Sequence, residues 1–357
     1  MSESWVDYYR QITDFITGNA GIQIDQRSVT IPADLRPQFY SYFNLIIEKL
    51  LAEKLPDILF DSVELAREYS LAEAQTVKLL KLENITSNPR LESFLKNPVS
   101  ELNKEVLMPL FDLLQSKISA DQFEKYAVQN TILVFRRLFR AGYEAWAIVS
   151  LLNLLAPDKM IKVKTPPLDD DDGENIITPD QVSLFEDMKN LLMAGIGEGN
   201  IAVPEMIVRS SKTNSYVGFK AQPDKVTHKI QGFDNHRKWY PIDSISPINM
   251  HVELLYSSSS PDDIAITADC ERICKPDLLL FTRGFSRWYE NNGMDKIRPI
   301  HYGLKPKLGT FIISRDIIEA SNTEDEEEGI HIIQAEYDGS KLKQVLACLI
   351  DKNSNVD

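Results

Sequence analysis

The stretch Ala145-Trp-Ala-Ile-Val-Ser-Leu-Leu-Asn-Leu-Leu-Ala156 is the longest strongly apolar run in the chain. It contains Ser150 and Asn153, and it is well short of the ~20 apolar residues that span a bilayer. The preceding segment, Arg136-Arg-Leu-Phe-Arg140, is basic and aromatic. A helix that is apolar on all sides does not lie flat on a membrane surface, where one polar face is needed. We therefore predict a buried helix with a charged N-terminal turn, and no membrane partner.

Helical periodicity extends from this run back to the start of the chain. Apolar residues from Trp5 to Ile16 recur every three or four positions, which places them on one face of a helix. Prolines at Asn88-Pro89 and Asn97-Pro98 break the pattern. We predict an all-helical N-terminal domain over residues 1–162, with further helices at 32–55, 58–83, 99–117 and 120–155.

An acidic, proline-containing segment follows the helices. Pro166-Pro167 precedes the acidic run 168–174, and charge repulsion and proline both favour an extended connection. We predict a linker over residues 163–178. An EF-hand loop with Gly173 at its sixth position would have Leu168 first and Pro179 twelfth, so calcium binding of that kind is not expected.

The remaining residues, 179–357, have the pattern of a mixed domain. After a predicted helix over 179–193, short apolar runs alternate with turn residues and predict strands at 206–209, 216–220, 250–256, 277–281, 310–314 and 330–335. Long helical patterns between these runs are missing, which favours a mainly antiparallel sheet. A closing helix is predicted over 341–350. The predicted fold class is α+β, an all-helical domain followed by a mixed domain with a mainly antiparallel sheet.

Composition restricts the classes of function. The chain has 357 residues, of which 53 are acidic and 39 basic, giving a formal net charge of −14. This charge repels phosphate backbones and argues against broad electrostatic binding of DNA or RNA. The first residues lack the pattern of a secretory signal, and three cysteines do not make a disulfide framework. We expect a cytoplasmic protein, and no zinc at Cys270 and Cys274 because no second ligand pair at metal-site spacing stands nearby.

A possible metal site begins at Pro276-Asp277, just ahead of a predicted strand. Metal-dependent nucleases of the Pro-Asp type place an acid there and follow it with Glu-x-Lys on the next strand. No such spacing occurs between residues 278 and 308, and the nearest substitute is Glu336 with Lys341. The Pro-Asp dipeptide occurs at six places in the chain, so an ordinary turn residue is the alternative interpretation of Asp277.

Two further groups of residues suggest binding. His251 and Glu253 are two apart on a predicted strand, so both side chains could reach one metal from the same face, although a partly solvated sheet face explains them as well. The second group mixes cations with aromatic rings, as in sites that pair phosphates and stack bases. Its members are His236, Arg237, Lys238, Trp239, Arg283 and Arg287. Ordinary hairpin surfaces have the same composition.

These observations leave three classes of function. A non-catalytic interaction or regulatory protein is expected, because several helices could present grooves to a protein partner. The first alternative is a metal-dependent nuclease or phosphodiesterase at Asp277, Glu336 and Lys341, and only this alternative requires a cofactor, a divalent metal. The second alternative is non-catalytic nucleic-acid binding through the basic and aromatic residues. No catalytic residue is assigned outside the first alternative.

Overall fold

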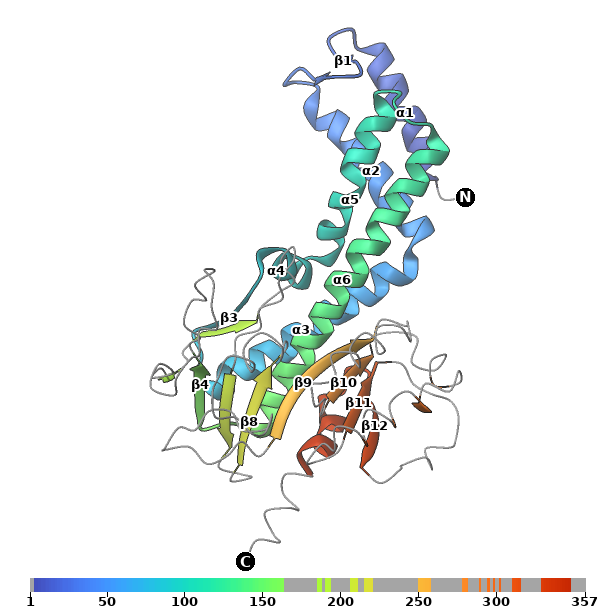
Figure 1. Cartoon of the computed structure of the whole chain (residues 1–357). Coiled ribbons are helices and arrows are strands. Elements are labelled where there is room, and N and C mark those ends of the chain that lie inside the picture. Colours follow the sequence, from blue (N-terminus) through green and yellow to red (C-terminus); the bar gives the residue numbers. More distant parts are fainter. Residues whose placement is uncertain are drawn as a thin grey trace, which may run out of the picture. The chain divides into compact units, whose positions relative to one another are not determined.

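The computed structural model describes most of the helical part of the chain and the strands that follow it (Figure 1). The described residues are 3–163, 185–187, 190–193, 206–210, 215–220, 250–257, 278–281, 289, 294, 295, 298, 302, 310–315 and 329–347. They divide into two compact units. Unit 1 comprises residues 1–67 and 90–139, and unit 2 comprises residues 68–89 and 140–357. Two long helices, α3 (Pro56–Leu80) and α6 (Ala120–Leu155), contribute residues to both units.

Unit 1 is built from helices whose ends are marked in the sequence. Besides parts of α3 and α6 it contains α1 (Trp5–Gly18), α2 (Arg36–Lys54), α4 (Pro89–Lys96) and α5 (Pro98–Leu114). Pro89 and Pro98 begin their helices, where a missing N–H has no cost, and the Asn97 side chain caps α5 by accepting from the Ser100 amide at 3.2 Å. The prolines that break the predicted pattern are therefore helix starts.

Aromatic side chains fill the core of unit 1. Trp5 of α1 lies edge-on to Phe123 of α6 with ring centroids 5.2 Å apart, and Phe43 of α2 contacts Phe111 of α5 at 4.7 Å. Trp5, Phe43 and Phe123 are buried. The Trp5 backbone amide also donates to the Glu53 carboxylate at 3.0 Å, so the start of α1 is joined to the end of α2. These contacts bury the apolar face of each helix, as its periodicity predicts.

Unit 2 is organised around the last turns of α6. Every residue from 141 to 152 is buried, which confirms the buried helix predicted from the apolar run. The Thr76 hydroxyl of α3 donates to the Val149 carbonyl at 3.2 Å, and the Asn153 amide donates to the Ala72 carbonyl at 3.1 Å. Side-chain hydrogen bonds thus satisfy polar groups where the two helices meet inside the unit.

Eight of the described strands of unit 2 form one mixed sheet in the order β12-β11-β10-β9-β8-β7-β4-β5 (Figure 1). Its members are β4 (Lys159–Val163), β5 (Phe185–Asp187), β7 (Met206–Ser210), β8 (Ser215–Lys220), β9 (Met250–Ser257), β10 (Leu278–Phe281), β11 (Thr310–Ser314) and β12 (Ile330–Gln334). The six strands predicted after residue 200 are all present in this sheet.

The prediction of a mainly antiparallel sheet is correct for only one half of it. Strands β5, β4, β7 and β8 pair antiparallel, whereas β8 to β12 pair parallel in sequence order. The prediction relied on missing helical patterns between strands, but strand direction is set by the tertiary path of the connections. A better signal was the apolar character of the strands themselves. All five residues of β11 are buried, as in parallel strands covered on both faces.

Short strands account for the other differences from the predicted elements. The helix predicted over 179–193 is wrong, because β5 and β6 (Asn190–Met193) lie there. Strand β6 pairs parallel with β3 (Asn84–Ser87), so long-range pairing overrides the local helical spacing. A small hairpin, β1 (Gln23–Ile24) with β2 (Val29–Thr30), joins α1 to α2. The other helices predicted in the N-terminal part are present, but α4 was not predicted, and β3 and β4 lie within the range predicted as all-helical.

Two further predictions, the linker and the closing helix, fall partly outside the described residues. Residues 164–178 of the predicted linker lie outside them, so the predicted domain boundary stays a prediction. The closing helix is present as a 3-10 turn, Gly339–Leu342, followed by helical residues 343–347. Among the described helices, none combines the length and the apolar character needed to cross a bilayer.

Candidate functional site

Two of the residues considered for metal-dependent catalysis, Glu336 and Lys341, are described, and each takes part in a hydrogen bond to a backbone carbonyl of unit 2. The Glu336 carbonyl accepts a hydrogen bond from the Tyr143 hydroxyl at 2.8 Å, and Glu336 has a φ of 48°, which turns the chain sharply after β12. The Lys341 ammonium donates to the Gln334 carbonyl at 2.9 Å. Both residues thus hold the segment that follows β12 in place, while Asp277 lies outside the described residues.

The strand register also bears on this metal site. Leu278, the first residue of β10, is in register with Phe311, which is in register with His331. Strand β12 continues from His331 to Gln334, which at ~3.3 Å per residue carries the chain ~10 Å toward the opposite end of the sheet before Glu336 is reached. This register counts against a shared metal site at Glu336 and the start of β10.

The other predicted binding residues are placed only in part. His251 and Glu253 lie on β9, where they are in register with Gly218 and Lys220 of β8. The basic and aromatic residues His236, Arg237, Lys238, Trp239, Arg283 and Arg287 lie outside the described residues. Within the described part of the chain, no group of three or more His, Cys, Asp or Glu side chains is placed to hold a metal.

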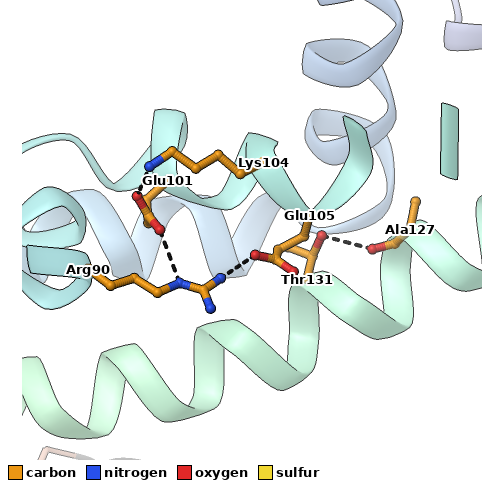
Figure 2. A network of polar contacts seen from close by, with 6 residues as sticks. All are labelled: Arg90, Glu101, Lys104, Glu105, Ala127 and Thr131. Atoms are coloured by element: carbon orange, nitrogen blue, oxygen red, sulfur yellow. Dashed lines mark hydrogen bonds and ion pairs between the residues drawn. The ribbon is translucent and has the colours of Figure 1, made fainter. Parts of the chain in front are cut away.

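A charged cluster in unit 1 was not predicted from the sequence (Figure 2). Glu101 of α5, which is 1% exposed, accepts from the Arg90 Nε of α4 at 3.1 Å, and its other oxygen pairs with Lys104. Arg90 also pairs with Glu105. Burial raises the pKa of Glu101, but hydrogen bonds from Lys104, Ser93 and Arg90 outweigh it and hold the pKa below its usual value. Two cations balance two carboxylates, so this cluster ties α4 to α5.

A second buried carboxylic acid, Glu144 of α6, has the opposite surroundings. Its side chain is 5% exposed, and Oε1 has no hydrogen-bond partner among the described residues. Burial raises the pKa of Glu144 to about 8, although the Arg140 charge acts to lower it. The neutral form of the carboxyl therefore predominates at pH 7. A single acidic residue beside the apolar run was the signal in the sequence that the prediction did not use.

Two neighbouring apolar side chains on α3 are exposed in unit 1. Phe60 is 67% exposed and Val63 is 50% exposed, and residues three apart lie side by side on a helix surface. Ile58 and Leu65 on the opposite face are buried. Periodicity alone did not distinguish these faces, because apolar residues recur at helical spacing on both.

Single exposed apolar side chains also occur on the neighbouring helices of unit 1. They are Tyr40, Met108, Tyr126 and Leu133. Isolated residues of this kind are ordinary on protein surfaces, whereas an adjacent pair is a larger apolar contact. Comparisons of this chain with protein-family models, with curated protein sequences and with solved structures find no match.

Proposed function

We propose that this protein is a non-catalytic interaction or regulatory protein of the cytoplasm, which binds a protein partner through Phe60 and Val63 of α3. The observation that supports it most is the exposure of these two neighbouring apolar side chains on a long helix. Burying one such side chain at an interface removes enough apolar surface from water to contribute roughly 1.5–3 kcal/mol. Aromatic anchors of this kind dominate the energetics of many interfaces.

The residues around the pair resemble the edge of an interface. Asp57 is one turn before Phe60 and Arg67 is one turn after Val63, and both are exposed. An apolar centre with a charged rim is the usual arrangement of a protein-binding surface. The partner is expected to present an apolar groove or patch to this face of α3, as in helix-in-groove recognition.

The surroundings of the described charged residues also fit a non-catalytic role. Glu101 is paired with two cations, which fixes its charge, and the Lys341 ammonium donates to the Gln334 backbone carbonyl. A catalytic acid or base needs a pKa near the working pH and access to the substrate. Glu144 has a raised pKa of about 8, near the working pH, but its side chain is buried and has no access to a substrate.

The test is affinity capture from an extract of the source cells with three forms of the full chain. We expect a stoichiometric protein partner with the native chain, loss of that partner with Phe60→Ser combined with Val63→Ser, and retention with Leu133→Ser, an equally exposed control on α6. Far-UV circular dichroism establishes that all three forms are folded. Retention of the same partner by the double variant would contradict the proposal.

Affinity capture and a thermal melt separate the two alternatives. Recovery of nucleic acid without a protein partner would favour nucleic-acid binding through the basic and aromatic residues 236–239, 283 and 287. A manganese-dependent rise in melting temperature that Asp277→Ala abolishes would favour the metal-dependent nuclease, since a ligand bound to the native state stabilises it.

A further inference from the structure

The exposed face of the first half of α6 is positively charged. Between residues 125 and 139 the chain has three basic residues and no acidic residue. Lys125 and Arg136 are exposed, and Arg137 is half-buried. None of these three side chains forms an ion pair or a hydrogen bond with a described residue. The charges of Lys125 and Arg136 therefore face water without a described acid at ion-pair distance, although the whole chain has a formal net charge of −14.

Cations on the neighbouring helices of unit 1 differ, because they have acidic partners. Arg10 of α1 lies 3.4 Å from Asp7, and Lys54 of α2 lies 2.8 Å from Glu124 of α6. Glu124 is the last acidic residue of α6 before Glu144, and it already pairs with Lys54. The positive charge of the α6 face is therefore not neutralised by the helix itself.

Two exposed apolar side chains lie along the same face. Tyr126 is 43% exposed and Leu133 is 64% exposed. They are seven residues apart, which is about two helical turns and ~10 Å along the axis. Lys125 precedes Tyr126, and Arg136 lies one turn after Leu133. Each apolar side chain taken singly is ordinary, but these two lie between unpaired cations on one helix face.

We propose that this face of α6, residues 125–137, binds an acidic amphipathic helix of a partner protein. The apolar stripe of the partner packs against Tyr126 and Leu133, whose spacing matches two turns of a facing helix. Carboxylates beside that stripe pair with Lys125 and Arg136, as flanking charges do in paired helices. The charges of the two surfaces are then complementary, which selects an acidic partner over a basic one.

The acidic character of the whole chain does not prevent this binding. At physiological ionic strength the Debye length is about 8 Å, so distant carboxylates are largely screened, whereas charges in direct contact are not. A phosphate backbone would satisfy the cations, but it has no apolar stripe to cover the exposed Leu133 between them. An acidic amphipathic helix satisfies both features of the face, so the observations favour a protein ligand.

This surface differs in charge from the face of α3 in the proposed function. Phe60 and Val63 have a rim of both signs, Asp57 and Arg67, whereas the charged residues of α6 between positions 125 and 137 are all basic. The two surfaces therefore select different partners. Leu133→Ser, which retains the α3 partner, should lose the acidic helix.

Fluorescence anisotropy of a labelled synthetic peptide tests this proposal. The peptide has about three heptads with Leu at positions a and d and Glu at e and g, so that repulsion between the glutamates keeps it from pairing with itself. A second peptide with the same composition in scrambled order lacks the apolar stripe. We expect the full chain to bind the first peptide at least about tenfold more tightly than the scrambled one.

Variants of the full chain assign the binding to α6. Lys125→Glu combined with Arg136→Glu should weaken it at least about tenfold, because like charges then face each other. Leu133→Ser should also weaken it about tenfold or more, because it removes apolar area from the contact. The control, Arg10→Glu combined with Lys96→Glu, changes the net charge equally at exposed positions of α1 and α4, and should weaken binding less than about threefold. Far-UV circular dichroism establishes that all variants are folded.

The proposal would be overturned by a native chain that does not bind the peptide, by equal binding of the scrambled peptide, or by an equal loss in the control variant. Tighter binding of a labelled single-stranded DNA oligonucleotide, lost with Lys125→Glu and Arg136→Glu, would overturn it in favour of nucleic acid. Phe60→Ser combined with Val63→Ser should bind the peptide as the native chain does. Loss of the peptide in that variant would place its site on α3 instead.

Discussion

Glu101 of unit 1 and Glu144 of unit 2 are both buried glutamates on long helices, yet their surroundings act on them in opposite directions. Glu101 pairs with Arg90 and Lys104, and its pKa is lowered despite burial. Glu144 has a carboxyl oxygen without a hydrogen-bond partner among the described residues, and burial raises its pKa to about 8. Burial by itself therefore does not set the charge of a carboxyl, since its hydrogen-bond donors decide the outcome.

The two regions differ in how they are stabilised and in how they respond to pH. A lowered pKa stabilises the folded state above the unfolded pKa of Glu101, and this contribution is lost as the pH falls through the folded pKa. A raised pKa, as in Glu144, stabilises the folded state at low pH instead. The stability associated with neutral Glu144 is complete below pH 4.5 and is lost as the pH rises toward about 8.

The largest expected effect tests whether Glu144 lies in a close-packed core. Leu152, two turns later on α6, is fully buried, whereas Leu133 on the same helix is 64% exposed. We expect Leu152→Ala to lower the free energy of unfolding by about 2–5 kcal/mol, because it leaves a cavity. The matched variant Leu133→Ala should change it by less than about 0.5 kcal/mol. Urea unfolding followed by circular dichroism measures both, and similar losses for the two variants would mean that α6 is not a core helix at Leu152.

The next effect tests the paired carboxylate. Glu101→Gln removes the charge that Arg90 and Lys104 share, and we expect it to cost about 1–3 kcal/mol of unfolding free energy at pH 7. Glu105→Gln is the control, because Glu105 is more exposed and pairs with Arg90 alone among the described residues, so about 0–1 kcal/mol is expected. Equal costs would show that burial of Glu101 adds nothing to its ion pairs.

A smaller effect tests the packing of the segment after β12 on α6. Tyr143→Phe removes the hydroxyl that donates to the Glu336 carbonyl and keeps the ring that packs on Trp146 and Tyr337. The expected cost is about 0.5–1.5 kcal/mol, that of one hydrogen bond. Tyr126→Phe, at an exposed position of α6, should have no measurable effect in the same urea titration. A Tyr143→Phe variant as stable as the native chain would show that this hydrogen bond does not stabilise the packing of the segment after β12 on α6.

The smallest effect on stability concerns the exposed face of α3. Phe60→Ser and Val63→Ser should each change the unfolding free energy by less than about 0.5 kcal/mol, because both side chains already face water. Leu65→Ser, on the buried face, should unfold the protein or lower its melting temperature strongly. Thermal melts of the three variants make the comparison. A large loss at Phe60 would show that this residue supports the fold rather than a partner.

Local sequence patterns predicted most of the helices and the positions of the six strands after residue 200. The 120–155 helix was predicted with its observed bounds, because apolar periodicity and the closing Ala156-Pro157 are both local signals. The direction of β8 to β12 was predicted wrongly and the pairing of β3 with β6 was not predicted, since both depend on residues far apart in the chain. The candidate site was less predictable. Which face of α3 stays exposed, and whether a buried carboxyl finds donors, are decided only by tertiary packing.

The opposite behaviour of Glu101 and Glu144 is tested by the free energy of unfolding of the native chain, Glu101→Gln and Glu144→Gln between pH 4 and 8.5. Relative to Glu144→Gln, the native chain should lose about 3–4 kcal/mol as the pH rises from 5 to 8.5. Relative to Glu101→Gln, it should keep a constant advantage over that range and lose it below pH 4.5. Parallel pH curves for the native chain and Glu144→Gln from pH 5 to 8.5 would contradict the account.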